Sequence, residues 1–369
     1  MIELKGTYTN AKIFTDNVEE SALKQIEHLL EQEFVSGSKI RIMPDVHAGM
    51  GCTIGTTMTI IDKIVPNLVG VDIGCGMETL LLADKRLDLL QLDKAIHNHI
   101  PAGFEIRKSP HHYNEKIDLE KLRCAKHVNI KRAILSIGTL GGGNHFIELG
   151  QDDEGQLYLV IHSGSRNIGL QVAEYYQKTA ADNLGRKGKG ADRVLAYAIG
   201  EIFDDYIHDM AIMQHYADLN RKAMANELTK RLKLKVEDQF TTVHNYIDLD
   251  SMILRKGAIS AKQGERMLIP MNMRDGSLVC IGKGNPDWNY SAPHGAGRIM
   301  SRSAAFKSIT LTQFEKAMEG IYSSTVNKKT IDEAPFAYKP MEEIVSNISE
   351  TAEISKIVKP LYNFKAGDE

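Results

Sequence analysis

The chain has 369 residues, with 45 lysines and arginines against 48 aspartates and glutamates, so its formal net charge is −3. Hydrophobic residues make up 43% and charged residues 25% of the chain, which excludes a disordered or membrane-embedded protein. The near-neutral charge argues against a protein that coats nucleic acid nonspecifically, but it is compatible with a local basic groove.

The four cysteines are widely spaced and include no Cys-x-x-Cys pair, which excludes a disulfide framework and a zinc knuckle. No basic-then-apolar leader is seen, and no apolar run approaches the ~20 residues that span a bilayer. We therefore expect a cytoplasmic protein with reduced thiols and no membrane partner. Cys52, Cys124 and Cys280 are expected to fill the core.

Short apolar runs and amphipathic stretches succeed one another along the chain. Buried strands are expected at residues 39–43, 64–71, 133–137 and 157–161. Helices are expected at residues 19–32, 171–184, 193–232, 314–321 and 341–348. The pattern predicts one α/β domain over residues 1–369 with a mixed core and a helical insertion at roughly 171–236.

Glycines gather in short clusters, several of which directly follow an expected strand. Such clusters occur where the backbone needs positive φ or approaches another group closely. The clusters lie at residues 49–55, 70–76, 138–143, 164–169, 282–284 and 295–297. We expect these loops to converge on one site.

Five metal-ligating side chains lie in or near these loops. Asp72 and Cys75 share one glycine-rich turn, although a buried cysteine beside a turn aspartate explains that segment about equally well. His145 follows a glycine run, His162 ends an expected strand, and His244 alone would be weak evidence. Together, these oxygen, nitrogen and sulfur donors suit Mn²⁺, Zn²⁺, Co²⁺ or Ni²⁺. A bridging thiolate would hold two ions ~4 Å apart.

A second group of residues has the chemistry of phosphate and base recognition. The glycines at 141–143 offer backbone N–H groups to a phosphate, and Asn144 adds an amide. Glu148 stands in an apolar context, where a carboxylate needs a specific partner such as the N–H donors of a base. Arg166 suits bidentate phosphate binding. A glycine-punctuated surface turn is the alternative explanation of the 141–143 segment.

His294 stands in a His-Gly-Ala-Gly-Arg loop, whose glycines let a bulky group approach the imidazole. Arg298 and Arg302 would neutralise phosphate charge. The residues alone leave His294 open as a metal ligand, a general acid or base, a covalent nucleophile or a surface histidine.

These segments resemble the RtcB-type RNA ligases. Five motifs carry the resemblance, and they occur in the family's order over roughly residues 40–302. They are Pro44-Asp-Val-His47, Asp72-Ile-Gly-Cys75, Gly-Gly-Gly-Asn-His-Phe-Ile-Glu148, His-Ser-Gly-Ser-Arg166 and His-Gly-Ala-Gly-Arg298. It implies an α+β fold of packed mixed and antiparallel sheets flanked by helices.

The resemblance also implies a reaction. RNA ends with a 2′,3′-cyclic phosphate or 3′-phosphate would be joined to 5′-hydroxyl ends, with GTP and two Mn²⁺ ions, in RNA repair or tRNA splicing. His294 would take GMP from GTP. Cys75 would bridge the two ions, with Asp72 and His145 on one ion and the remaining ligands, His162 and His244, on the other.

By the same resemblance, Asn144 would hold the α-phosphate and Glu148 would bind the guanine edge. The other nucleotide-binding positions would be Ser277, Gly295, Ala296, Gly297, Arg298 and Lys365. The RNA or phosphate contacts would be Asp45, His47, Arg166 and Arg302. A monomer or a homodimer is expected, and an activating protein partner is left open.

Two positions depart from the family pattern. Asn272 replaces a usual guanine-side serine, and Lys365-Ala-Gly replaces the common Lys-Gly ending, which suggests a divergent subgroup. Two alternatives therefore stay open: a metal-dependent RNA phosphodiesterase that does not ligate, and a non-catalytic RNA-binding subunit. Basic stretches at 121–132, 186–189 and 221–235 are candidate RNA contacts, although each alone more often forms a solvated surface.

Overall fold

A seven-stranded antiparallel sheet forms the centre of the computed structural model, which describes residues 1–186 and 192–366. Its strand order is β12-β13-β15-β6-β7-β5-β8. In chain order these strands are β5 (Gly76–Leu82), β6 (Phe146–Gln151), β7 (Leu157–Ser163), β8 (Val236–Val243), β12 (Arg266–Asn272), β13 (Gly276–Gly282) and β15 (Ala352–Lys365). Every residue of β7 is buried, as its continuous apolar run requires.

A second, mixed sheet has six strands in the order β1-β2-β3-β4-β10-β9, with β2 and β3 parallel and the other pairs antiparallel. Its strands are β1 (Ile2–Lys5), β2 (Asn10–Ile13), β3 (Ile40–His47), β4 (Ile54–Thr59), β9 (Asn245–Asp248) and β10 (Ile253–Lys256). A small pair joins β11 (Ala258–Ser260) to β14 (Ser291–Pro293). His244 therefore lies where the chain leaves the first sheet and enters the second.

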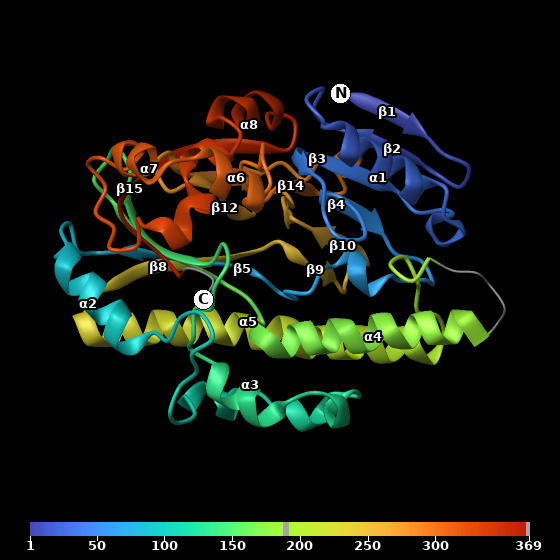
Figure 1. Cartoon of the computed structure of the whole chain (residues 1–369), viewed down its shortest axis with the longest axis horizontal. Helices are drawn as coiled ribbons and strands as arrows, with labels where there is room; N and C mark the ends of the chain where they lie inside the picture. The colour runs from blue at the N-terminus through green and yellow to red at the C-terminus, as the bar shows by residue number, and fades with distance from the viewer. Residues whose placement is uncertain (187–191, 367–369) are drawn as a thin grey trace.

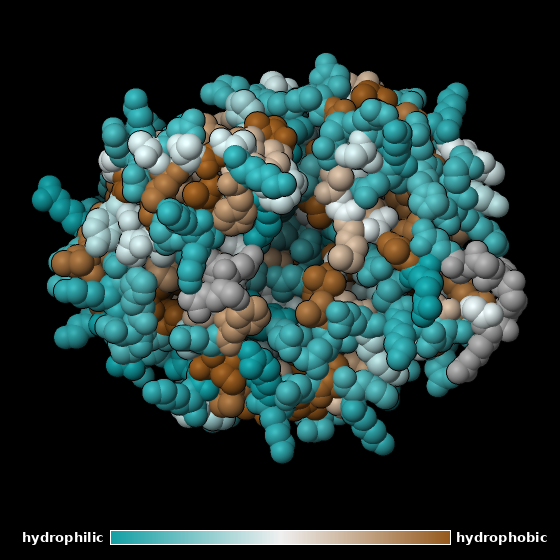
Figure 2. All heavy atoms as spheres, in the orientation of Figure 1, coloured by the Kyte–Doolittle hydropathy of each residue, from teal (hydrophilic) through white to brown (hydrophobic). Residues whose placement is uncertain are grey.

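The helices cover these sheets. They are α1 (Glu20–Leu30), α2 (Leu89–His99), α3 (Ile130–Ser136), α4 (Arg166–Arg186), α5 (Glu201–Leu232), α6 (Arg302–Ser308), α7 (Leu311–Ala317) and α8 (Met341–Asn347). Figure 1 shows α4 and α5 running side by side beneath the strands, and α5 packs against β5 and β7. Figure 2 shows a largely hydrophilic face that is hollowed near its centre.

This architecture confirms the predicted class: an α+β domain of mixed and antiparallel sheets flanked by helices. Helices α4 and α5 occupy most of residues 171–236, but their status as an insertion stays a prediction. Among the described residues, no helix combines the length and the apolar character that crossing a bilayer requires.

Two of the four predicted strands are confirmed, as parts of β3 and β7. The prediction at 64–71 is wrong, because this segment has only an isolated bridge at Ile64 and a 3₁₀ turn at Pro66–Leu68. The prediction at 133–137 is also wrong, because Asn129 caps the helix α3 by accepting a hydrogen bond from the Arg132 N–H at 3.0 Å.

The helix predictions are confirmed in type, with shifted ends. The helix expected at 193–232 begins only at Glu201, after Gly200, whose φ is 58°. The helix expected at 314–321 begins earlier, because Thr310 and Gln313 form a capping box that starts α7 at Leu311. Cys52, Cys124 and Cys280 are buried and free, which confirms their prediction as core residues.

Candidate metal centre and adjoining pocket

Five potential metal ligands converge around the Cys75 sulfur. Its Sγ lies 3.3 Å from Nε2 of His162 and 3.5 Å from Nε2 of His145. The His145 Nε2 is in turn 2.9 Å from Oδ2 of Asp72, and the His162 Nε2 is 3.4 Å from Nε2 of His244. Cys75 thus belongs to two three-residue groups, Asp72–Cys75–His145 and Cys75–His162–His244, whose ligand atoms lie within 4.8 Å of one another.

The strand register explains this convergence. Strand β5 lies between β7 and β8, and Gly76 at its start pairs with Ser163 on one side and Val243 on the other. Cys75 directly precedes Gly76, His162 directly precedes Ser163, and His244 directly follows Val243. The pairing of the strands therefore brings these three ligands together. A Cβ on Gly76 would lie 2.3 Å from the Thr242 carbonyl oxygen, so only glycine lets the strands approach this closely.

Two of the imidazoles are oriented by hydrogen bonds, and two are held uncharged, as metal binding requires. Nδ1 of His145 lies 2.8 Å from the Leu140 carbonyl oxygen, and Nδ1 of His162 lies 3.2 Å from the Asn144 carbonyl oxygen. A proton held at each Nδ1 leaves Nε2 as the electron-pair donor toward the cluster. Burial lowers the pKa of His162 and of His244 well below the ordinary value, which keeps both rings neutral.

Cys75 and Asp72 complete a donor set that fits a transition metal. Burial, reinforced by the Asp72 charge, raises the pKa of the Cys75 thiol well above its usual value. Burial opposes ionisation of Asp72 as well, but the hydrogen bond and charge of His145 hold the pKa of this carboxyl below its usual range. A cation at the cluster would supply the charge that the thiolate needs. These donors suit Mn²⁺, Zn²⁺, Co²⁺ or Ni²⁺.

Two buried polar residues of α5 hold the ligand loops from behind. Nη1 of Arg221 donates to the carbonyl oxygens of Gly74 at 2.6 Å and Ser163 at 2.9 Å. Asn220 accepts from the Gly138 N–H at 2.8 Å and donates to the Gly164 carbonyl oxygen at 3.0 Å. Three glycine loops therefore share one anchor.

Arg221 lies in the basic stretch 221–235, which was predicted as a candidate RNA contact, and no local motif predicts its role as an anchor. That interpretation of Arg221 is wrong, because its side chain is fully buried. The signal that reveals it is an asparagine and an arginine on the apolar face of a long helix. Residues 187–189 of the stretch at 186–189 lie outside the described residues.

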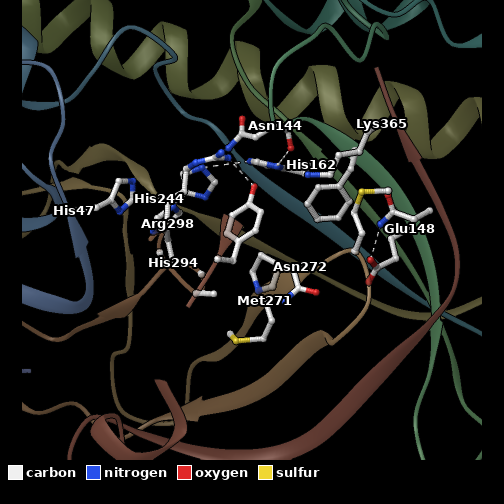
Figure 3. Close-up of a pocket in the computed structure, with 18 of the residues that line it drawn as sticks. His47, Asn144, Glu148, His162, His244, Met271, Asn272, His294, Arg298 and Lys365 are labelled. Atoms are coloured by element: carbon white, nitrogen blue, oxygen red, sulfur yellow. Dashed lines mark hydrogen bonds between the residues drawn. The ribbon is translucent and has the colours of Figure 1, made fainter. Parts of the chain in front are cut away.

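His294 lies beside the metal centre, directly after β14. Its ring centroid is 5.0 Å from that of His244. Its Nδ1 lies 2.6 Å from Oδ2 of Asp45, a carboxylate that also accepts from the backbone N–H groups of His294 and Gly295. With Nδ1 engaged by Asp45, Nε2 of His294 is the nitrogen left for chemistry. Figure 3 shows His294 and His244 together on one side of the pocket.

The pocket that His294 enters has a volume of about 750 Å³, including its open mouth, which suits a nucleotide. Figure 3 shows Glu148 at the far side of the pocket from His294. The other lining residues are His47, Asn144, Phe146, His162, His244, Pro270, Met271, Asn272, Met273, Gly295, Ala296, Gly297, Arg298, Arg302, Tyr338, Asn363 and Lys365.

Glu148 has an unused acceptor in this pocket. Its Oε2 accepts a hydrogen bond from Nδ2 of Asn363 at 2.8 Å, whereas its buried Oε1 has no hydrogen-bond partner. Burial raises the pKa of Glu148 to about 7, against the effects of Asn363 and the charge of Lys365. An orphaned carboxylate oxygen is costly to bury, so a ligand with N–H donors fits this position.

Glu333 lies near three cationic side chains that line this pocket. It pairs with Nζ of Lys365, and its Oε1 lies 3.3 Å from Nη1 of Arg298 and 3.8 Å from Nη2 of Arg302. Burial opposes its ionisation, but the charge and hydrogen bond of Lys365 lower the pKa of Glu333 to about 2. The sequence analysis did not single out Glu333, and no local motif marks it.

The structure separates the remaining predicted residues into three groups. His47, Asn272, Arg302 and the 295–298 loop line the pocket, and their contacts with a nucleotide or RNA stay predictions. Arg166 instead lines a second cavity with Asp72, and Ser277 is buried within β13 rather than lining the pocket. The fully buried Asp45 carboxylate contacts His294 and has no exposed surface toward RNA.

The fold and the site together define a mixed α+β protein with a candidate metal centre that opens into a nucleotide-sized pocket. The family model of the tRNA-splicing ligase RtcB matches residues 25–126 and 111–366, and the chain belongs to the RtcB family.

Relatives in bacteria and archaea match over most of their length. The RNA-splicing ligase RtcB of Escherichia coli strain K12 is 31% identical, over 91% of this chain and 92% of the relative. The tRNA-splicing ligase RtcB of Aeropyrum pernix is 28% identical, over 86% and 85%. That of Nanoarchaeum equitans is 26% identical, over 86% and 85%.

Proposed function

We propose that this protein is a GTP-dependent RNA ligase that joins 2′,3′-cyclic-phosphate or 3′-phosphate ends to 5′-hydroxyl ends. The observation that carries the proposal is the position of His294, whose ring lies 5.0 Å from the metal-site ligand His244 and at the mouth of a pocket that reaches Glu148. A histidine nucleophile in that place can reach a nucleotide phosphate while the base lies deeper. Family membership supports the same activity.

In the first chemical step, Nε2 of His294 attacks the α-phosphorus of GTP. A phosphorus–nitrogen bond forms, the bond to the bridging oxygen breaks, and pyrophosphate leaves. Asp45 keeps the proton on Nδ1 and fixes the ring, so that the Nε2 electron pair points into the pocket. Asn144 lines the pocket, and its side-chain amide would donate to the α-phosphate.

Guanine is the base that Glu148 fits. The guanine edge presents N–H donors at N1 and N2, which a carboxylate accepts in pairs, whereas adenine presents no donor at N1. Lys365 and Asn272 line the same end of the pocket. The side chain of Asn272 is already engaged, since Nδ2 donates to Asp275 at 2.7 Å and Oδ1 accepts two backbone N–H groups. Glu148 is therefore the side chain that selects guanine.

Asp72, Cys75, His145, His162 and His244 would hold Mn²⁺, which would supply positive charge to neutralise phosphate oxygens at this site. Water first opens a cyclic phosphate to a 3′-phosphate. An oxygen of the RNA 3′-phosphate then attacks the phosphorus held by His294, the phosphorus–nitrogen bond breaks, and GMP becomes a leaving group on the RNA end. The 5′-hydroxyl oxygen then attacks that phosphate, the new phosphodiester forms, and GMP departs. His47, Arg298 and Arg302 supply positive or hydrogen-bonding groups along the pocket. The reaction suits RNA repair or tRNA splicing.

One experiment tests the proposal directly. The protein is incubated with radiolabelled GTP, Mn²⁺ and an RNA bearing cyclic-phosphate and 5′-hydroxyl ends, and both the protein–GMP adduct and the joined RNA are scored. We expect an acid-labile adduct that is absent in His294→Ala. Opening of the cyclic phosphate without adduct or joining would instead indicate a phosphodiesterase. RNA binding without any turnover, unchanged in Cys75→Ala, would indicate a binding subunit.

A further inference from the structure

A second cavity shares no lining residue with the nucleotide pocket. Asp72 opens into this cavity, whereas His162, His244 and His294 line the nucleotide pocket. The cavity encloses about 1110 Å³, including open space. Besides Asp72, its lining includes Phe104, Glu105, Arg132, Arg166 and Leu170. Ligands of one cluster therefore line two different cavities, and substrate can lie in either.

Phe104 is the notable side chain at this second cavity, because 73% of it is exposed. An exposed phenylalanine loses the hydrophobic stabilisation that burial would give it. Its neighbours in the cavity include two arginines, Arg132 and Arg166, and two acids, Glu105 and Asp72. Aromatic rings beside arginines form the common binding surface for unpaired nucleic acid.

The loop that carries Phe104 is fixed in place. The Gly103 N–H donates to the Gly141 carbonyl oxygen at 3.0 Å, and Ala102 forms a bridge with Gly141. Nη2 of Arg132 donates to the carbonyl oxygen of Phe104 at 2.9 Å. The backbone at Phe104 is thus held beside the same glycine run that leads to His145. A fixed backbone reduces the conformational entropy that is lost when the side chain stacks on a ligand.

We infer that Phe104 is a stacking surface for an unpaired RNA base next to the strand end that reacts at the metal centre. The stacked base would lie in the cavity on the Asp72 side, and the arginines would face the adjoining phosphates. This inference deepens the proposed function and rests on it for the identity of RNA. The ring stacks on any base, so it contributes affinity and position without sequence selection.

Fluorescence of a Phe104→Trp variant tests the inference in the absence of GTP. The natural Trp288 is buried, with 2% exposure, and serves as a constant background. Unpaired RNA oligonucleotides with either a 3′-phosphate or a 5′-hydroxyl end are titrated separately, which identifies the strand that stacks. We expect quenching that is lost when the terminal nucleotides are abasic. A Tyr8→Trp variant, whose parent residue is 41% exposed on the N-terminal segment, should not respond.

Ligation kinetics give a second readout. In Phe104→Ala and Phe104→Leu we expect the KM for RNA to rise by roughly 5- to 100-fold, the range for losing one stacked base. Phe104→Tyr and Phe104→Trp should restore it, and adduct formation with GTP should not change. Unchanged KM in Phe104→Ala, or no quenching with either strand, overturns the inference. Quenching without ligation would instead refute the proposed ligase while retaining the RNA site.

Discussion

Oδ2 of Asp45 lies 2.6 Å from Nδ1 of His294, and the two residues come from different sheets. Asp45 belongs to β3 of the six-stranded sheet, and His294 follows β14 of the small pair. The carboxylate has no exposed surface, so it cannot contact solvent or RNA. Its structural role is to fix one proton and one ring orientation on His294.

Asp45→Asn should slow formation of the protein–GMP adduct by about 10²–10⁴-fold, because an amide no longer selects the Nδ1–H tautomer. The measurement is the single-turnover rate of adduct formation by mass spectrometry. Metal content should stay normal, since Asp45 is not among the ligands. Asp62→Asn, with a side chain that is 70% exposed, is the matched control. An adduct rate equal to that of the unaltered protein would contradict the assigned role.

Cys75→Ala should remove most bound metal, because its sulfur belongs to both ligand groups. We expect Mn²⁺ affinity to fall by more than the roughly 10–100-fold that follows loss of a ligand's hydrogen-bond partner. Metal content after dialysis, measured by mass spectrometry, and the shift in Tm on adding Mn²⁺ both report the change. Cys52→Ala, a buried cysteine outside the cluster, should retain the metal. Equal metal content in the two variants would exclude Cys75 as a ligand.

Arg221→Met should weaken metal binding by about 10–100-fold without removing any ligand. The carbonyl oxygens of Gly74 and Ser163 lose their donor, and each unpaired buried group costs about 1–3 kcal/mol. Isothermal titration with Mn²⁺ measures the affinity, and Arg221→Lys should recover part of it. The neighbouring Lys222→Met is the control. If both methionine variants bind Mn²⁺ alike, Arg221 does not position the loops.

Glu148→Gln should stabilise the ligand-free protein more at pH 8 than at pH 5. Burial raises the pKa of Glu148 from 4.5 to about 7, so the folded state disfavours the carboxylate. Wild-type stability therefore falls as pH rises from about 4.5 to about 7, and the full penalty applies above that range. The amide removes a penalty of about 3 kcal/mol at pH 8. Thermal unfolding at both pH values measures the difference.

Glu3→Gln, at a side chain that is 57% exposed, should show no such pH dependence. The same Glu148→Gln substitution should also reduce the preference for GTP over ATP in adduct formation, because the amide matches the two guanine donors poorly. A Tm difference that does not vary between pH 5 and pH 8 would mean that the pKa of Glu148 is the same in the folded protein as in the unfolded chain.

The linear sequence was enough to predict the fold class, the ligand types and the glycine loops. Periodicity identified α1 and β7, but it failed at 133–137, where the Asn129 cap converts an apolar run into helix. Such an error is expected, because a short apolar run suits a buried strand and a buried helix equally. The family motifs supplied His294 and Glu148 without showing what surrounds them.

Only the tertiary structure decided which groups act together. Cys75 bridges two groups because β5 lies between β7 and β8, and Arg221 anchors the loops because α5 packs beneath them. Asp45 was expected to contact RNA or phosphate, whereas in the structure its carboxylate contacts His294. The sequence by itself determined the donor atoms, since these are properties of residue types. Distances, burial and pairing depend on segments far apart in the chain, and packing alone sets them.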